Sequence, residues 1–252
     1  MNIRKTALVT GGSARIGRAI CEGLADVGYA IAVHYNSSSK DAEVLVEALK
    51  QKSIDAIAVQ ADLSSSEDTR ALIGKVTREL GPLGVLVNNA SLFEEDSFDM
   101  SDEALWDAHF AVHVKAPALL TSAFADQLSD DAQGLVVNII DERVWKLTPN
   151  VASYTLSKSA LWTATRTMAQ KFAPKVRINA IGPGPTLPST RQTDEDFAKQ
   201  LNTLPLKVAP DLSDFAKTIL YFVDMKSVTG QMIALDGGQH IGWQTPDQLL
   251  PE

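Results

Sequence analysis

Short apolar runs alternate with longer segments of helical periodicity along almost the whole chain, and this alternation limits the fold more than any other feature of the sequence. Each run has the length of a strand buried on both faces, and each longer segment suits a helix. Strands and helices that alternate at this spacing form βαβ units and a parallel sheet. We therefore predict an α/β fold with strands at residues 7–10, 30–35, 56–60, 85–88, 135–140, 176–180 and 232–235, and helices at 16–27, 40–51, 66–80, 102–128, 153–172 and 212–223.

Composition limits the functional class. The 252 residues carry 23 Lys and Arg against 31 Asp and Glu, a net charge of −8, which argues against nucleic acid or an anionic membrane as partner. The apolar run at residues 6–9 is too short for a signal sequence, and no run approaches the length of a membrane span. The single cysteine, Cys21, and the four histidines show no metal-ligand spacing. We expect one domain, residues 1–252, in the reducing cytoplasm and without a metal site.

A glycine-rich turn follows the first predicted strand and leads directly into a helix. Gly11 permits a tight turn, Gly17 lets the helix pack closely on the strand, and the helix N-terminus directs free N–H groups toward a pyrophosphate. An ordinary strand-to-helix turn is the alternative. The position of the glycine-rich turn after the first strand of a βαβ series favours dinucleotide binding, and we expect Ser13, Arg15 and Ile16 also to contact the cofactor.

The end of the second predicted strand favours NADP over NAD. NAD sites usually place an acidic residue there to bind the ribose 2′-hydroxyl, but here the next acid is Asp41, inside the following helix. The hydroxyls of Ser37 and Ser38, with Arg15 nearby, would bind a 2′-phosphate. Alternatively, the two serines cap the helix that begins near residue 40.

Two further strand ends and one loop complete the predicted cofactor site. Asp62 follows the third strand and would bind the adenine or cap the next helix, and Asn88 to Ser91 follow the fourth strand. Prolines at 183, 185 and 188 interrupt the irregular stretch after residue 182, which we interpret as the start of a substrate lid at about 183–210. The predicted cofactor-binding residues are Gly11, Ser13, Arg15, Ile16, Gly17, His34, Tyr35, Asn36, Ser37, Ser38, Ala61, Asp62, Leu63, Asn89, Ala90, Ser91, Tyr154, Lys158, Pro183 and Gly184.

The spacing of Tyr154 and Lys158 indicates a chemical centre. Residues i and i+4 lie on one face of a helix, so the ammonium of Lys158 can lie beneath the hydroxyl of Tyr154. We expect this cation to lower the pKa of the phenol toward the range useful for proton transfer. Alone, the pair is a common helical coincidence, but it occurs here together with the glycine turn and Asn88-Asn89-Ala90.

With these motifs, the chain resembles the short-chain dehydrogenase/reductase family from Thr10 to Leu235-Asp236-Gly237-Gly238. The resemblance implies a Rossmann-type fold, in which a doubly wound parallel sheet of about seven strands carries helices on both faces. It also implies that Tyr154 is the acid, that Lys158 binds the nicotinamide ribose, and that the protein is a homotetramer. The apolar residues of the predicted helix at 153–172 exceed what one sheet would cover, which supports association unless the helix is fully buried in one subunit.

Four departures from the family pattern resemble the pteridine reductases and the dihydromonapterin reductases, also called alternative dihydrofolate reductases. Arg15 replaces the middle glycine of the turn, Asp141 replaces the usual serine 13 residues before Tyr154, and Ser91 and Phe93 follow the fourth strand. His113 replaces the usual asparagine; this matches the dihydromonapterin type, whereas pteridine reductases keep asparagine there.

The chemistry of a pterin agrees with these departures. A carboxylate such as Asp141 is a better partner than serine for the ring nitrogens and exocyclic amine. A flat heterocycle also fits between the nicotinamide and the ring of Phe93, unless Phe93 only packs in the core. The predicted catalytic residues are Tyr154, Lys158 and Asp141, and the predicted substrate-binding residues are Arg15, Ser91, Phe93, Asp141, Tyr154 and Pro185.

We therefore expect NADPH-dependent reduction of a dihydropterin (dihydromonapterin, dihydrobiopterin or dihydrofolate) to the tetrahydro form. Tyr154, with Lys158 and Asp141, would deliver the proton to a ring nitrogen. One alternative is a carbonyl reductase that acts on 3-oxoacyl or sugar substrates, against which Asp141 counts. Another is a catalytically silent NADP-binding sensor, against which the retention of Tyr154 and Lys158 counts.

Overall fold

A parallel seven-stranded sheet forms the centre of the molecule. The computed structural model describes residues 3–99, 102–189 and 191–243. Within them, the strand order is β3-β2-β1-β4-β5-β6-β7, and every neighbouring pair is parallel. This confirms the predicted doubly wound fold. The strands are β1 (Thr6–Val9), β2 (Ala30–Tyr35), β3 (Ala56–Gln60), β4 (Val85–Asn88), β5 (Gly134–Ile139), β6 (Val176–Pro183) and β7 (Met232–Leu235).

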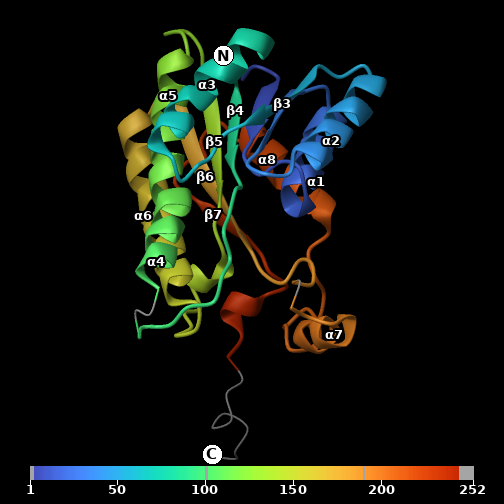
Figure 1. Cartoon of the computed structure of the whole chain (residues 1–252), viewed down its shortest axis with the longest axis vertical. Helices are drawn as coiled ribbons and strands as arrows, with labels where there is room; N and C mark the ends of the chain where they lie inside the picture. The colour runs from blue at the N-terminus through green and yellow to red at the C-terminus, as the bar shows by residue number, and fades with distance from the viewer. Residues whose placement is uncertain (1–2, 100–101, 190, 244–252) are drawn as a thin grey trace, which may run out of the picture.

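Helices cover both faces of the sheet (Figure 1). One layer contains α1 (Arg15–Ala25), α2 (Ser39–Gln51) and α8 (Leu212–Asp224), and the other contains α3 (Ser66–Leu80), α5 (Ala116–Gln127) and α6 (Ala152–Phe172). Each strand contributes side chains to both layers, because successive side chains along a strand point to opposite faces of the sheet. Ala7 and Val9 pack in the first core, and Leu8 packs in the second. The apolar runs therefore do not alternate with polar residues.

The structure differs from the predicted helices in two places. The segment predicted as one helix at 102–128 is divided into α4 (Glu103–Phe110), a π-helical turn (Ala111–Lys115) and α5. A further helix, α7 (Asp194–Asn202), lies inside the predicted lid, where Thr193 and Asp196 form a capping box. The sequence prediction missed this capping box, although its spacing is a helix-start signal. Among the described residues, no helix is both long and apolar enough to cross a membrane.

The order of the strands determines where a ligand can bind. The chain turns outward in opposite directions from β1 and β4, and the carboxyl ends of such neighbouring strands border a crevice. At this crevice the backbone of Gly17 packs directly against the glycine turn. A Cβ on Gly17 would lie only 2.1 Å from the carbonyl oxygen of Gly11, so no larger residue fits. Arg15 keeps the left-handed backbone (φ 50°) that a glycine would adopt easily. The loop therefore retains a glycine-type turn although its central residue has a side chain.

Candidate active site

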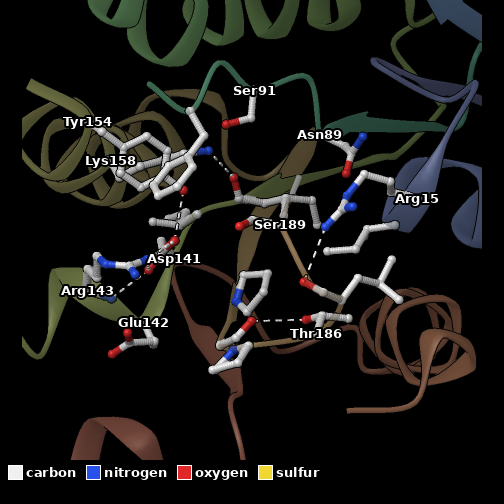
Figure 2. A pocket seen from close by; sticks show the side chains of 18 of the residues that line it. Arg15, Asn89, Ser91, Asp141, Glu142, Arg143, Tyr154, Lys158, Thr186 and Ser189 are labelled. Carbon is white, nitrogen blue, oxygen red and sulfur yellow. Dashed lines mark hydrogen bonds and ion pairs between the residues drawn. The ribbon is translucent and has the colours of Figure 1, made fainter. Parts of the chain in front are cut away.

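A cavity of about 500 Å³ opens at the carboxyl ends of β1, β4, β5 and β6. Its lining brings together most of the predicted site, including the glycine turn and Arg15 on one side and Tyr154 and Lys158 on the other (Figure 2). The predicted residues in the lining are Gly11, Arg15, Ile16, Gly17, Asn89, Ala90, Ser91, Phe93, Asp141, Tyr154, Lys158, Pro183, Gly184 and Pro185.

Tyr154 and Asp141 are directly hydrogen-bonded. The phenolic hydroxyl of Tyr154 donates to Oδ2 of Asp141 at 2.8 Å. The same carboxylate accepts from the backbone N–H of Arg143 at 2.9 Å and pairs with the guanidinium at 3.1 Å. Burial raises the pKa of Tyr154 well above its ordinary value of 10, and the negative charge of Asp141 raises it further. The phenol therefore holds its proton tightly.

Lys158 does not act on Tyr154 as the spacing predicted. Its ammonium donates to the carbonyl of Ile139 at 3.0 Å and lies 5.7 Å from the centroid of the Tyr154 ring. The pKa of the phenol is raised and not lowered, contrary to the prediction, because burial and then the charge of Asp141 disfavour the phenolate. Burial also lowers the pKa of Lys158 to about 8, although Asp141 opposes this shift.

The N-terminus of α6 holds Tyr154 in a crowded position. The ring of Tyr154 is in edge contact with Phe93 at 4.8 Å between centroids, with His113 at 5.4 Å and with His109 at 6.0 Å. Asp96 caps the helix, because its carboxylate accepts from the backbone N–H of Ser153 at 3.0 Å. Sequence reasoning missed Asp96, since its partner is 57 residues away in the chain.

The glycine turn is tied to the loop after β4. The amide nitrogen of Asn89 donates to the carbonyl of Thr10 at 2.8 Å and to that of Gly11 at 3.0 Å. The hydroxyl of Thr10 accepts from the backbone N–H groups of Asn89 and Ala90, both at 2.9 Å. Asn89 therefore positions the turn, whereas its lining neighbour Ala90 contributes only backbone and a methyl group to the cavity wall.

The side chain of His34 bonds the glycine turn to the end of β3. Its Nδ1 accepts from the backbone N–H of Gly11 at 3.0 Å, and its Nε2 lies 3.1 Å from the carbonyl oxygen of Ala61. Since Nδ1 accepts, the hydrogen is on Nε2 and is donated to Ala61. Burial lowers the pKa of His34 to about 4, so the ring is neutral at physiological pH. His34 thus links three elements and does not line the cavity.

Several predicted cofactor residues lie outside the cavity lining, at the ends of β2 and β3 and, for Ser13, in the glycine turn after β1. Ser38 begins α2 without a side-chain capping bond, so the alternative that it caps this helix through its hydroxyl does not apply. Asp62 instead accepts from the backbone N–H and the hydroxyl of Ser64 and so stabilises the turn before α3. The predicted residues outside the lining are Ser13, His34, Tyr35, Asn36, Ser37, Ser38, Ala61, Asp62 and Leu63.

The segment after β6 lines the cavity and contacts residues on both of its sides. The guanidinium of Arg15 donates to the carbonyls of Pro188 at 3.2 Å and Leu187 at 3.3 Å, so it points to this segment. On the other side, Arg191 forms ion pairs with Glu94 and with Glu95, the latter at 3.3 Å. Residues from this segment in the lining include Thr186, Leu187, Ser189, Gln192, Phe197 and Gln200.

Two lining residues that sequence reasoning missed carry unsatisfied oxygens. Oε2 of Glu142 and Oε1 of Gln239 are buried without a hydrogen-bond partner. Burial, and next the charge of Asp141, raise the pKa of Glu142 to about 7. Its position directly after Asp141 was the available signal. Among the described residues, no three or more His, Cys, Asp or Glu side chains gather as a metal ion would require.

Comparisons with known proteins agree with this geometry. A model of the short chain dehydrogenase family matches residues 5–200. The chain belongs to this family. A 3-oxoacyl-(acyl-carrier-protein) reductase of Staphylococcus aureus is 30% identical over 246 residues, which cover 96% of this chain and 100% of the relative.

Two solved structures are more similar to this short chain dehydrogenase. The FolM alternative dihydrofolate reductase 1 of Brucella canis, complexed with NADP, is 54% identical with a TM-score of 0.94, over 96% of each chain. That of Brucella suis, also in complex with NADP, is 52% identical with a TM-score of 0.91, over 96% of this chain and 98% of the other. The predicted family and its reductase branch are confirmed by these similarities.

The buried carboxyl of Glu142 predicts a pH-dependent stability. Its pKa is higher in the folded protein than in the unfolded chain, so its contribution to stability is present at low pH and is lost as the pH rises toward 7. We expect Glu142→Gln to stabilise the protein by about 2 kcal/mol at pH 8 and to have little effect at pH 5.

Denaturant unfolding at the two pH values measures this difference. Glu79→Gln, on the exposed side of α3, is the matched control and should change neither value. An equal stabilisation by Glu142→Gln at pH 5 and pH 8 would contradict the assignment of a raised pKa to this carboxyl.

Proposed function

We propose that this chain is an NADPH-dependent reductase that converts a dihydropterin to the tetrahydro form, with dihydromonapterin, dihydrobiopterin or dihydrofolate as substrate. The observation that carries the proposal is the hydrogen bond from the hydroxyl of Tyr154 to the carboxylate of Asp141, at 2.8 Å in the wall of the cavity. A carbonyl reductase needs donors for one substrate oxygen, whereas Asp141 offers only acceptors. A pterin carries N–H donors that such a carboxylate can bind.

The aromatic side of the cavity also fits a flat ring. Phe93 keeps 41% of its surface exposed, although its edge touches Tyr154, so it is not an ordinary core residue. The guanidinium of Arg143 lies 5.7 Å from the centroid of the Phe93 ring. Aromatic and guanidinium planes of this kind stack on heterocycles. Phe93 and Arg143 would therefore form one side of the pterin site.

The glycine turn fits the diphosphate of NADP. No side chain caps the first turn of α1, and no acidic residue lies in it, so its N–H groups remain available to an anion. Lys158 and Asn89 line the side on which the nicotinamide and its ribose would lie, next to Pro183 and Gly184. The exposed Ser37 and Ser38 would bind the 2′-phosphate. When bound, the cofactor supplies the hydride.

Tyr154 supplies the proton in this proposal. Reduction of a C=N bond places a hydride on carbon and a proton on nitrogen, and the raised pKa of Tyr154 keeps its proton on oxygen until a nitrogen of higher basicity develops. The hydroxyl donates to Asp141 in this structure; a pterin N–H group bound to this carboxylate would take that place, which frees the phenolic hydrogen for the ring nitrogen.

Residues 1–252 act as one domain in this proposal, with about 183–210 as a substrate lid. The lid is supported by the bonds from Arg15 to Leu187 and Pro188 and by the ion pairs of Arg191. Residue 190 lies outside the described residues. Cys21 is fully buried and is the only cysteine, which suits work in the reducing cytoplasm.

Removal of the carboxylate tests the substrate class. We expect the unmodified protein to oxidise NADPH with dihydropterins, and Asp141→Ser to lower kcat/KM for them about 100-fold, since a charge-assisted hydrogen bond contributes about 1.5–3 kcal/mol. NADPH affinity should change less than twofold, because Asp141 faces the substrate side. The assay is NADPH absorbance with dihydropterins, dihydrofolate and a ketone panel.

Tyr154→Phe is the matched control, which should abolish turnover while NADPH still binds. Undiminished dihydropterin turnover in Asp141→Ser would contradict the pterin assignment. Reduction of ketones alone would indicate a carbonyl reductase, and NADPH binding without any turnover would indicate a sensor.

The end of β2 predicts the choice of cofactor. We expect NADPH to bind far more tightly than NADH, and Ser37→Asp to weaken NADPH about tenfold, or about 1.4 kcal/mol, while NADH is unaffected, because the new carboxylate repels a 2′-phosphate. Fluorescence titration of both cofactors measures this. Ser53→Asp, which adds the same charge after α2, is the control. Equal affinities of the unmodified protein for NADPH and NADH would exclude the 2′-phosphate site.

We further propose that the protein is a homotetramer. Much of α6 is covered within one subunit, since Leu161, Thr165 and Ala169 are buried, so this helix supplies less free apolar surface than its sequence suggested. Exposed apolar side chains instead gather beside its N-terminal half, where Phe98, Leu147 and Leu156 line a groove. Light scattering at micromolar concentration should give four times the chain mass of 27.2 kDa. A mass near one chain would refute association, and a mass near two chains would refute the tetramer.

A further inference from the structure

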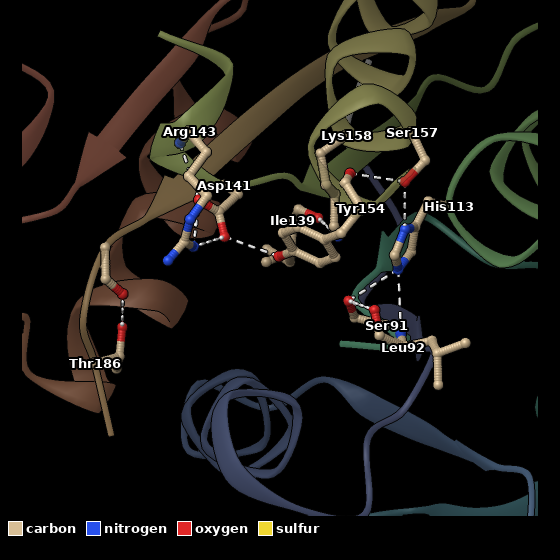
Figure 3. A network of polar contacts seen from close by, with 11 residues as sticks. Ser91, Leu92, His113, Ile139, Asp141, Arg143, Tyr154, Ser157, Lys158 and Thr186 are labelled. Atoms are coloured by element: carbon tan, nitrogen blue, oxygen red, sulfur yellow. Dashed lines mark hydrogen bonds and ion pairs between the residues drawn. The ribbon is translucent and has the colours of Figure 1, made fainter. Parts of the chain in front are cut away.

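His113 joins the loop after β4 to the helix that carries Tyr154 (Figure 3). Its Nε2 lies 3.1 Å from the backbone nitrogen of Leu92 and 3.0 Å from the hydroxyl oxygen of Ser91. Its Nδ1 lies 2.8 Å from the hydroxyl oxygen of Ser157, which donates to the carbonyl of Tyr154 at 2.8 Å. The ring is 1% exposed and lies on the π-helical turn between α4 and α5.

These contacts fix the tautomer of His113. A backbone N–H can only donate, so the Nε2 that faces Leu92 carries no hydrogen. The hydrogen is therefore on Nδ1, where it is donated to Ser157, and Ser157 can pass its own hydrogen to the Tyr154 carbonyl. Burial, followed by the charges of Lys158 and His109, lowers the pKa of His113, so the ring stays neutral.

The fixed tautomer determines how Ser91 bonds. Between Ser91 and the bare Nε2, the only available hydrogen is that of the serine hydroxyl, whose oxygen lies 3.0 Å from this nitrogen and 3.5 Å from the alternative acceptor, the carbonyl oxygen of Leu92. Ser91 also lines the cavity and is exposed to it. We propose that His113 is a specificity-determining residue: by accepting the hydroxyl hydrogen of Ser91, it leaves only acceptor lone pairs toward the substrate, which selects N–H groups and rejects carbonyl oxygens.

This inference rests on the proposed dihydropterin reduction and refines it. Asp141 and Ser91 then offer acceptors from two sides of one cavity, and the hydroxyl hydrogen of Tyr154 is already directed at Asp141. A pterin can satisfy these acceptors with its amine and ring N–H groups. A ketone would leave the Ser91 lone pairs facing its own oxygen, and a buried unpaired polar group costs about 1–3 kcal/mol.

Two substitutions separate the two nitrogens of His113. In His113→Gln the longer side chain can place its amide oxygen where Nε2 stood, so the acceptor for Ser91 is kept. In His113→Asn the shorter side chain reaches only the position of Nδ1, where its N–H donates to Ser157 and the acceptor is lost. We measure kcat/KM with NADPH for a dihydropterin and for an activated ketone. The ratio of kcat/KM for the dihydropterin to kcat/KM for the ketone should stay within twofold in His113→Gln. It should fall about tenfold in His113→Asn, an effect that the loss of one hydrogen bond is enough to cause.

The ratio cancels effects on folding and on cofactor binding, which change both substrates together. A purely structural role predicts equal losses for both substrates, with His113→Asn the milder variant because it keeps the bond to Ser157. The proposal would be overturned by equal losses for the two substrates, by a milder effect of His113→Asn than of His113→Gln, or by an unchanged ratio in His113→Asn.

Nitrogen NMR of the full chain with ¹⁵N-labelled histidine tests the tautomer without any turnover. The His113 signals are assigned by their loss in His113→Gln. We expect a protonated Nδ1 and an unprotonated Nε2 from pH 6 to pH 8, with NADP⁺ present. An Nε2–H tautomer or an imidazolium at pH 7 would overturn the assignment. If dihydropterins are not reduced but the NMR result holds, the proposed function fails while the orientation of Ser91 stands.

Discussion

Hydrogen bonds made by side chains buried at the carboxyl end of the sheet hold the elements of the site together, and the rest of the site depends on them. The amide of Asn88 donates to Asn138 at 2.8 Å, and the amide of Asn138 donates to Thr165 at 2.8 Å, which joins β4, β5 and α6. Lys158 bonds the last residue of β5. An unpaired buried group of this kind costs about 1–3 kcal/mol, so these bonds fix the relative positions of the elements. Tyr154 lies on the helix that they hold.

Burial at this end of the sheet also determines the charge states around Tyr154. Burial raises the pKa of Tyr154 and lowers that of Lys158 to about 8, so it acts against the charged form of each. Asp141 opposes the shift of Lys158 and adds to that of Tyr154. Asp141 therefore supports the charged form of Lys158, and the phenol of Tyr154 stays neutral. The substitution of Asp for the usual serine thus changes the proton affinity of the whole group.

Much of the fold and part of the site follow from the sequence because they depend on local patterns. Strands buried on both faces leave continuous apolar runs, and four of the seven predicted strands, among them 30–35 and 85–88, have the observed bounds. The glycine turn and the spacing of Tyr154 and Lys158 are equally local. The partners of these residues are not local. Asp96 caps α6 across 57 residues, and the ammonium of Lys158 bonds Ile139, so neither the cap nor the direction of the Tyr154 pKa shift could be predicted from spacing.

Arg15 shows how one substitution can change the role of a turn without changing its path. Its backbone keeps the left-handed conformation that a glycine adopts without strain, at a cost of order 1 kcal/mol or more for a side chain that has a Cβ. The guanidinium binds two carbonyls, of Leu187 and Pro188, in the segment after β6. Arg191 binds Glu94 and Glu95 from the opposite side of the same segment. A segment held at both sides by charged groups can open only when these contacts are exchanged for water. Both contacts are solvent-exposed, so this exchange costs little. The turn that would bind the diphosphate therefore also carries the side chain that bonds the segment after β6, so the proposed cofactor site and the proposed lid share this residue.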